Sequence, residues 1–102
     1  PQAAHQVFYH DCDSALAARA VARLVDQPLA PLNTPIELTD HRFGTVRRSA
    51  ILCLNDRAIT PGLQRKLFER GQCEQLLELQ SGHSPFYAIP EKLAAAILEL
   101  AD

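Results

Sequence analysis

The sequence predicts an α/β chain in which a helix and a long connection precede a strand–helix–strand–helix unit with parallel strands. Three observations support this. Apolar residues recur at helical spacing over 14–24, every position of 50–54 is apolar, and Pro61 and Pro90 stand at helix starts on either side of a second strand. A short strand without alternation is typical of a parallel sheet covered on both faces. One right-handed crossover would join the two strands.

The first helix is expected to begin near residue 13, because Asp13 or Ser14 can cap the free N–H groups of its first turn. Apolar side chains at four-residue spacing would share one helix face: Leu16, Ala20 and Leu24. Pro28 is expected to end this helix. From there to Arg48 the chain indicates an irregular connection with a short extended piece at 36–38, because prolines interrupt it and apolar periodicity is weak.

The first strand is predicted at Ala50–Leu54. Thr60 and Pro61 are typical of a helix start, with Thr60 as the cap and Pro61 in the first helical position. Gly71 is expected to end this helix, and its apolar positions predict a buried stripe: Leu63, Leu67 and Phe68. A more polar second strand over 75–79 leads to a turn.

The turn covers residues 81–85, and the last helix begins at Pro90. Its apolar positions are Leu93, Ile97 and Leu98. The order of elements is therefore helix, connection, strand, helix, strand, helix, as in α/β proteins.

Composition sets limits on the class of protein. The chain has 102 residues, of which 47% are hydrophobic and 22% charged, and its net charge is −2. That size fits one small domain, and the charge gives no basic excess for binding nucleic acid or a membrane surface. No apolar run has the length of a membrane span. Three cysteines, Cys12, Cys53 and Cys73, form no paired framework, so a reducing, cytoplasmic setting is expected, with Cys53 as a core residue.

The sequence contains no methionine and begins at Pro1. Two explanations remain open at this point. An initiator methionine could have been removed before the proline, or the chain could be part of a longer polypeptide.

Two candidate catalytic residues follow the two predicted strands. Asp56 comes after the first strand and His83 after the second. Adjacent strands lie about 4.8 Å apart, and the carboxyl ends of parallel strands share one sheet edge, so these side chains are expected to meet. Such a pair can orient an imidazole and stabilise its protonated form. The alternative is a turn aspartate beside a structural histidine.

These 102 residues contain no serine in the setting of a nucleophile elbow that would complete the pair. Gly82-His83-Ser84 begins like the Gly-x-Ser-x-Gly elbow of serine hydrolases. However, Pro85 has no N–H to offer an oxyanion, and position 86 is Phe rather than Gly. Ser84 is therefore excluded as the nucleophile. The remaining serines lack the two-glycine setting as well: Ser14, Ser49 and Ser81.

The segments around the pair resemble a known superfamily. Residues 82–86 (GHSPF), followed by PEKL at 90–93, are similar to the final segment of α/β-hydrolases, and residues 48–64 resemble the strand, acid loop and Gln-bearing helix before it. The likeness is greatest to the esterase and hydroxynitrile-lyase branch, which includes the methyl esterases. By position, Asp56 matches the triad acid and His83 the triad base.

The resemblance also implies a division of the chain and a function. Residues 1–32 would be a remnant of the lid, since 8–13 and the following helix resemble its end, and 33–102 would be a C-terminal α/β-hydrolase segment. The implied function is the C-terminal portion of a serine-dependent carboxylic-ester hydrolase acting on a small ester, without a cofactor. Because the family keeps its nucleophile upstream, these 102 residues alone are expected to be inactive.

Alternatives of other classes remain. A lyase or dehalogenase can use the same scaffold, since the missing nucleophile distinguishes them. A non-catalytic module could instead dimerise or dock through the exposed edge of the first strand. The partner at that edge is expected to be either the missing N-terminal half of a hydrolase or a second copy of the chain.

Three further groups of residues have a structural and a functional interpretation. His10-Asp11-Cys12-Asp13, with His5 nearby, carries metal-ligand side chains, but helix capping accounts for the aspartates and no metal is expected. Three arginines before the first strand favour a solvated strand entrance over nucleic-acid contact: Arg42, Arg47 and Arg48. Aromatic residues either line an acyl pocket or pack the lid helix: Phe8 and Tyr9, with Phe86 as a third candidate for the lining.

Overall fold

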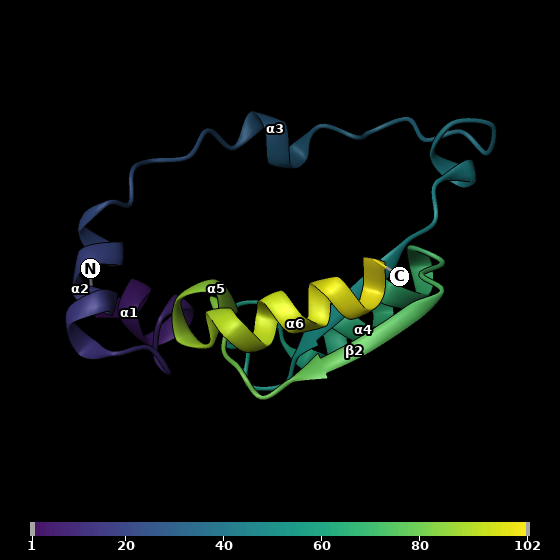
Figure 1. Cartoon of the computed structure of the whole chain (residues 1–102). Helices are drawn as coiled ribbons and strands as arrows, with labels where there is room; N and C mark the ends of the chain where they lie inside the picture. Colours follow the sequence, from purple (N-terminus) through teal and green to yellow (C-terminus); the bar gives the residue numbers. More distant parts are fainter. Residues whose placement is uncertain (1, 102) are drawn as a thin grey trace.

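The computed structural model describes residues 2–101. In chain order its elements are α1 (Gln2–Phe8), α2 (Ser14–Ala22), α3 (Ala30–Asn33), a 3₁₀ turn η1 (Phe43–Thr45), β1 (Ser49–Cys53), α4 (Pro61–Arg70), β2 (Gln75–Leu79), α5 (Pro85–Ala88) and α6 (Pro90–Ala101). The two N-terminal helices lie at one end of the molecule, next to α5, and the long connection arches from α2 to the start of β1 (Figure 1).

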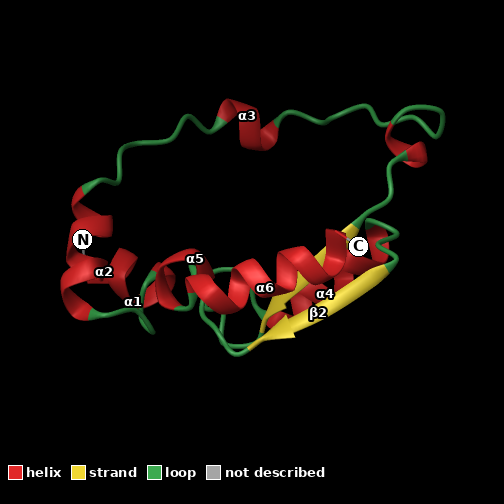
Figure 2. Ribbon diagram, in the orientation of Figure 1, coloured by secondary structure: helices red, strands yellow, loops and turns green. Residues whose placement is uncertain are grey.

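The sheet has two parallel strands, as predicted. β1 and β2 pair in register from Ser49 opposite Gln75 to Cys53 opposite Leu79. Helix α4 connects the strands and packs against β1, while α6 packs against β2, and both helices lie beside the strands in Figure 2. Leu52 is 2% exposed and Cys53 is buried, which confirms Cys53 as a core residue. The predicted mixed α/β fold is therefore confirmed.

The first predicted helix is confirmed at its start, but its predicted end is wrong. The Asp13 carboxylate accepts hydrogen bonds from the backbone N–H groups of Ala15 and Leu16, as expected of a cap. The helix ends at Ala22, six residues before Pro28. Its buried side is covered only as far as Ala20, and Leu24 is 47% exposed. The residues after Ala22 have no surface to pack against, so their apolar spacing is not enough to continue the helix.

Two short helices differ from the sequence-based expectation. Helix α1 and the single-turn helix α5 were not predicted, because neither carries a repeating apolar stripe. The expected extended piece at 36–38 lies in the irregular connection and pairs with no other strand among the described residues. Ile36 is 80% exposed and Leu38 60% exposed, so this piece has no neighbour to complete a ladder of hydrogen bonds.

Helix α4 begins at Pro61 and is capped at Gly71, as predicted, but two details were wrong. The Thr60 side chain makes no capping hydrogen bond; its carbonyl accepts one from the Gln64 N–H at 2.9 Å. The expected buried stripe is also incomplete, since Leu63 is 47% and Leu67 49% exposed. The described sheet has two strands, and Leu67 borders an open groove next to Ala50 and Ile51 of β1 instead of a covered core.

Arg48 fastens the end of the long connection to the sheet. Its Nε donates to the Gly71 carbonyl at 2.7 Å, one terminal nitrogen donates to the carbonyls of Phe43 and Val46, and its guanidinium lies 4.5 Å from the centre of the Phe43 ring. The expected solvated entrance therefore holds for Arg42 and Arg47, which are exposed, but not for Arg48. Among the described residues, no helix is long and apolar enough to cross a membrane.

Candidate active site

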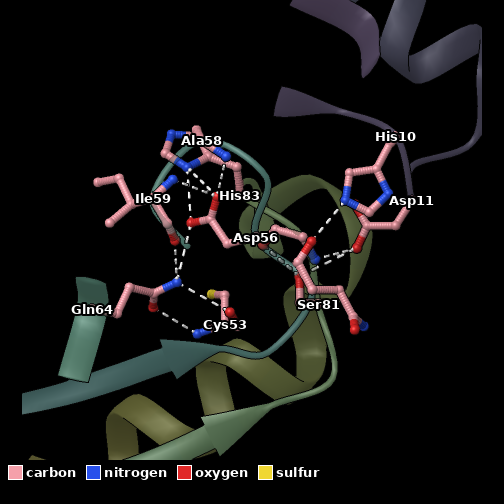
Figure 3. A network of polar contacts seen from close by, with 11 residues as sticks. His10, Asp11, Cys53, Asp56, Ala58, Ile59, Gln64, Ser81 and His83 are labelled. Atoms are coloured by element: carbon pink, nitrogen blue, oxygen red, sulfur yellow. Dashed lines mark hydrogen bonds and ion pairs between the residues drawn. The ribbon is translucent and has the colours of Figure 1, made fainter. Parts of the chain in front are cut away.

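Asp56 and His83 meet at the carboxyl ends of the two strands. Asp56 lies three residues after the end of β1, and His83 lies in the loop between β2 and α5. The His83 Nδ1 is 3.0 Å from one Asp56 carboxylate oxygen and 3.1 Å from the other, a contact drawn in Figure 3. Residues that are 27 positions apart are thus brought together by the parallel strands, as the sequence predicted.

The Asp56 carboxylate is buried and held by several donors. The residue is 8% exposed. Its Oδ1 accepts from the backbone N–H groups of Ala58 at 2.8 Å and Ile59 at 3.0 Å, and its Oδ2 accepts from Gln64 Nε2 at 3.4 Å. These hydrogen bonds fix the orientation of the carboxylate toward His83.

Gln64 connects the carboxylate to the end of the strand. Its Oε1 accepts from the Cys53 N–H at 2.9 Å, and its Nε2 donates to the carbonyls of Cys53 at 3.1 Å and Ile59 at 2.7 Å. The amide therefore bonds to both the N–H and the carbonyl of Cys53, and through Ile59 it also holds the loop that follows β1 (Figure 3). The family resemblance implied a glutamine on this helix, but the sequence did not predict that Gln64 contacts the end of the strand.

The hydrogen bond at Nδ1 determines the tautomer of His83. Because carboxylate oxygens only accept, Nδ1 must carry the proton, and neutral His83 then has Nε2 free as a base. In the described part of the chain, this Nε2 has no hydrogen-bond partner. The ring is about one-third exposed and lies 5.2 Å from the ring of Phe8. A base that faces a cavity is the arrangement that proton transfer requires.

The segment between α1 and α2 also contacts both loops. Asp11 accepts from the Gly82 N–H at 2.5 Å and from the Ser81 hydroxyl at 3.5 Å. The His10 Nε2 is 2.9 Å from the Asn55 carbonyl, to which it donates. Helix capping was expected to explain these aspartates, and for Asp11 that was wrong, since Asp13 alone caps α2. No set of three His, Cys, Asp or Glu side chains among residues 2–101 is placed to hold a metal ion.

Three predicted lining residues surround a cavity next to His83. Phe8, Tyr9, Phe86 and His83 border an open hollow of about 430 Å³. Phe86 is 57% exposed, whereas Tyr9 is buried and packs edge-on against Tyr87. Tyr9 also packs with Ala17 and Ala20 of α2, so it both packs against a helix and borders the cavity.

The nearby serine and cysteine side chains are poor nucleophiles. Ser81 and Ser84 are buried, and neither hydroxyl bonds to His83. Burial, and then the charge of Asp56, raises the pKa of the Cys53 thiol, while burial and the charge of Asp11 raise the pKa of the Cys12 thiol. A raised pKa keeps a thiol protonated and unreactive. The exclusion of Ser84 from sequence agrees with this geometry.

Sequence comparisons relate the chain to plant esterases. No family model matches it. It is 30% identical over 96 residues to an Arabidopsis thaliana protein assigned by name to the chloroplastic methylesterases, a match that covers 93% of this chain and 28% of the relative. It is also 34% identical over 64 residues to Salicylic acid-binding protein 2 of Nicotiana tabacum, covering 62% of this chain and 25% of that protein.

Solved structures show the same fold. Polyneuridine aldehyde esterase superposes on all of this chain with a TM-score of 0.90 and 19% identity, and the match covers 41% of its own chain. A pyrethroid hydrolase from Sphingobium faniae JZ-2 superposes on 96% of this chain with a TM-score of 0.70 and 23% identity, covering 39% of its chain.

The architecture is thus that of the α/β-hydrolases. Within that superfamily, the chain belongs to the methylesterase-like branch. It spans 28% of the length of the first of these relatives and 41% of the esterase structure. The first relative's name places that protein in the chloroplast, and a cytoplasmic location for this chain stays a prediction.

Proposed function

We propose that this chain provides the acid and the base of a serine-dependent carboxylic-ester hydrolase, with Asp56 as the acid and His83 as the base. The observation that carries the proposal is the contact of His83 Nδ1 with both oxygens of a buried carboxylate, at distances of 3.0 and 3.1 Å. The kinship with methylesterases supports the reaction type.

The chemistry follows from this geometry. His83 Nε2 accepts the proton of a serine hydroxyl as the serine oxygen attacks the ester carbonyl. The imidazolium then gives that proton to the alkoxide leaving group, so an alcohol departs and an acyl-enzyme remains. A water molecule then attacks the acyl-enzyme, with His83 Nε2 accepting its proton and returning it to the serine oxygen, and the carboxylic acid product is released. Asp56 holds Nδ1–H in place and stabilises the positive charge on the ring in both steps.

The serine and the oxyanion donors are proposed to lie elsewhere in the hydrolase fold. In this proposal residues 1–32 form the end of the lid and 33–102 the C-terminal segment of the hydrolase. The free edge of β1 supports it, since an apolar groove of about 530 Å³ runs beside that edge and also borders Asp56 and His83. Further strands paired there would bring a nucleophile to the strand ends where this pair lies.

The substrate is proposed to be a small ester with an apolar group next to the scissile bond. The cavity beside His83 is bordered by the apolar or aromatic residues Phe8, Tyr9, Leu24, Val25 and Phe86 and by two uncharged polar residues, Gln27 and Ser84; no Asp, Glu, Lys or Arg among the described residues lines it. Apolar walls with few polar groups suit a neutral small molecule. A lyase or a dehalogenase on this scaffold would use the same pair with a different chemistry.

A second candidate is a docking module without catalysis, which the free edge of β1 also supports. That edge leaves backbone groups of the strand available to a partner strand, either from the rest of a hydrolase or from a second copy. The two candidate functions differ in whether they need His83: ester hydrolysis requires its imidazole, whereas docking at the strand edge does not.

The test is ester hydrolysis by the intact polypeptide that contains these residues, compared with three variants. We expect His83→Ala and Asp56→Asn to lower kcat by about 10⁴-fold, the size of the effect at other triads. The matched control is His41→Ala, because His41 is exposed on the long connection, and it is expected to keep full activity. Full activity in His83→Ala, or an inactive parent protein, would reject the esterase proposal and leave the docking module.

A further inference from the structure

We infer that His10 and Asp11 form a clasp that positions the two catalytic loops relative to each other, an inference that rests on the proposed function of Asp56 and His83. The clasp lies between α1 and α2, and the loops follow β1 and β2. Each of its side chains bonds to the residue immediately before a member of the pair: His10 to Asn55, and Asp11 to Gly82.

Asp11 holds the loop that carries His83. The Gly82 N–H is buried and has the Asp11 carboxylate as its acceptor at 2.5 Å. The same oxygen lies 3.5 Å from the hydroxyl of Ser81, a residue with no exposed surface. A charged acceptor gives a stronger hydrogen bond than a neutral one, so this contact fixes the peptide from which the His83 side chain projects.

His10 holds the loop that carries Asp56. Its Nε2 donates to the Asn55 carbonyl at 2.9 Å, and the Asn55 N–H in turn donates to the Ser81 carbonyl at 3.0 Å. The clasp and the two loops therefore form one connected set of hydrogen bonds, visible around Ser81 in Figure 3. Moving either loop would change the 3.0 Å separation between His83 and Asp56.

Gly82 allows this close approach. A Cβ at position 82 would lie 2.6 Å from the Asp11 Oδ1 and 2.8 Å from the His10 Nε2. Both distances are far below a normal contact, so a side chain there would displace the clasp. Position 82 therefore requires a residue without a Cβ. This steric requirement supports the clasp independently of the hydrogen bonds.

The clasp is assigned a positioning role because neither side chain contacts the reacting groups. Asp11 and His10 bond only to Ser81, Gly82 and Asn55 among the described residues. Asp13 offers a matched comparison two positions further on. Its carboxylate also accepts two hydrogen bonds, but both come from α2, away from the loops.

The experiment uses the intact polypeptide and two readouts on each variant. One readout is the NMR signal of the His83 Nδ1–H, assigned by its loss in His83→Ala. The other is kcat and KM for ester hydrolysis. The variants are Asp11→Ala, Asp11→Asn, which keeps an amide oxygen as acceptor, and the control Asp13→Ala.

We expect Asp11→Ala to broaden or remove the Nδ1–H signal and to lower kcat by about 10- to 100-fold at nearly constant KM, since small misplacements of catalytic groups have effects of that size. Asp11→Asn should restore the signal and most of kcat. Asp13→Ala should leave both unchanged. An unchanged signal and kcat in Asp11→Ala would overturn the clasp, as would equal losses in Asp11→Ala and Asp13→Ala.

His10 provides a second, gentler pair of variants in case Asp11→Ala does not fold. His10→Gln keeps a nitrogen donor near the position of Nε2, and His10→Phe keeps the ring without the donor. We expect only His10→Phe to weaken the Nδ1–H signal and kcat, and equal behaviour of the two would contradict the clasp. If the unsubstituted protein lacks the Nδ1–H signal, the proposed function itself fails, so the two failures are distinguishable.

Discussion

Gln64 gives the most quantitative prediction, because one amide group serves four partners. Its Nε2 lies 2.7 Å from the Ile59 carbonyl, 3.1 Å from the Cys53 carbonyl and 3.4 Å from Asp56 Oδ2, and all three accept hydrogen bonds. Gln64→Ala removes these bonds and the acceptor of the Cys53 N–H. The Cys53 carbonyl also accepts from the Asp56 N–H, and Asp56 Oδ2 also contacts His83. Only the Cys53 N–H and the Ile59 carbonyl are therefore left without a partner among the described residues. At about 1 kcal/mol for each of these two groups, the free energy of unfolding should fall by about 2 kcal/mol at any pH.

Gln64→Glu has nearly the same shape but places a second carboxylate beside Asp56. At 3.4 Å and an effective dielectric constant of about 20, two negative charges repel by about 5 kcal/mol. Protonating a glutamate of ordinary pKa about 4.3 at about pH 7 costs only about 3.7 kcal/mol. The new side chain should therefore take up a proton in the folded protein, and its pKa should be raised.

The sign of the pH dependence follows from this raised pKa. The folded state of Gln64→Glu binds a proton that the unfolded state loses above about pH 4.3. Its stability is thus retained below that pH and lost as the pH rises through the folded pKa, by about 1.4 kcal/mol per pH unit. Gln64→Ala should show no such slope.

The assay is urea unfolding followed by far-UV circular dichroism, at several pH values, on the intact polypeptide and its variants. Gln75→Glu is the matched control, since Gln75 makes only a 3.5 Å contact with Ser49 and is exposed. A Gln64→Glu deficit that does not grow with pH, or that equals the deficit of Gln75→Glu at every pH, would refute the arrangement of Gln64 and Asp56.

Three further predictions concern other contacts. Gly82→Ala should lower kcat as far as Asp11→Ala does, because the added Cβ displaces the Asp11 and His10 side chains, and it should cost about 1 kcal/mol of stability, because the buried Gly82 N–H loses its acceptor; unchanged kcat would contradict this. Arg48→Lys should cost about 1–2 kcal/mol of stability and speed amide exchange over 43–46, since lysine cannot reach three carbonyls; equal exchange would contradict it. Because the pKa of Cys53 is raised by burial, stability should fall as the pH rises above the ordinary thiol pKa, and Cys53→Ala should reduce that fall; an identical alkaline fall in both proteins would be evidence against it.

The sequence predicted those parts of the molecule that depend on local pattern and on sheet topology. The apolar run at 50–54 predicts the strand that is observed at Ser49–Cys53, and the crossover rule predicts that Asp56 lies beside His83, as it does. Both inferences follow from general properties of parallel sheets, so they needed no knowledge of side-chain packing.

The contacts that hold the site could not be predicted in the same way. Asp11 and Gly82 are 71 positions apart, and nothing in the local sequence indicates that a carboxylate near one helix accepts from a backbone N–H near another. Leu63 and Leu67 misled the prediction for the opposite reason. Their spacing indicates a buried stripe, but burial depends on what packs against the helix, and in the described residues both leucines stay about half exposed, with Leu67 bordering an open groove.

The role of His83 as a proton acceptor can be tested most directly by chemical rescue. The measurement is the rate of ester hydrolysis by the His83→Ala variant of the intact polypeptide at increasing concentrations of added imidazole, after subtraction of the reaction without protein. Recovery that saturates with imidazole is expected, because the free ring can occupy the space next to the Asp56 carboxylate and replace the missing base. Full activity of His83→Ala without imidazole would contradict the assignment of His83 as the catalytic base.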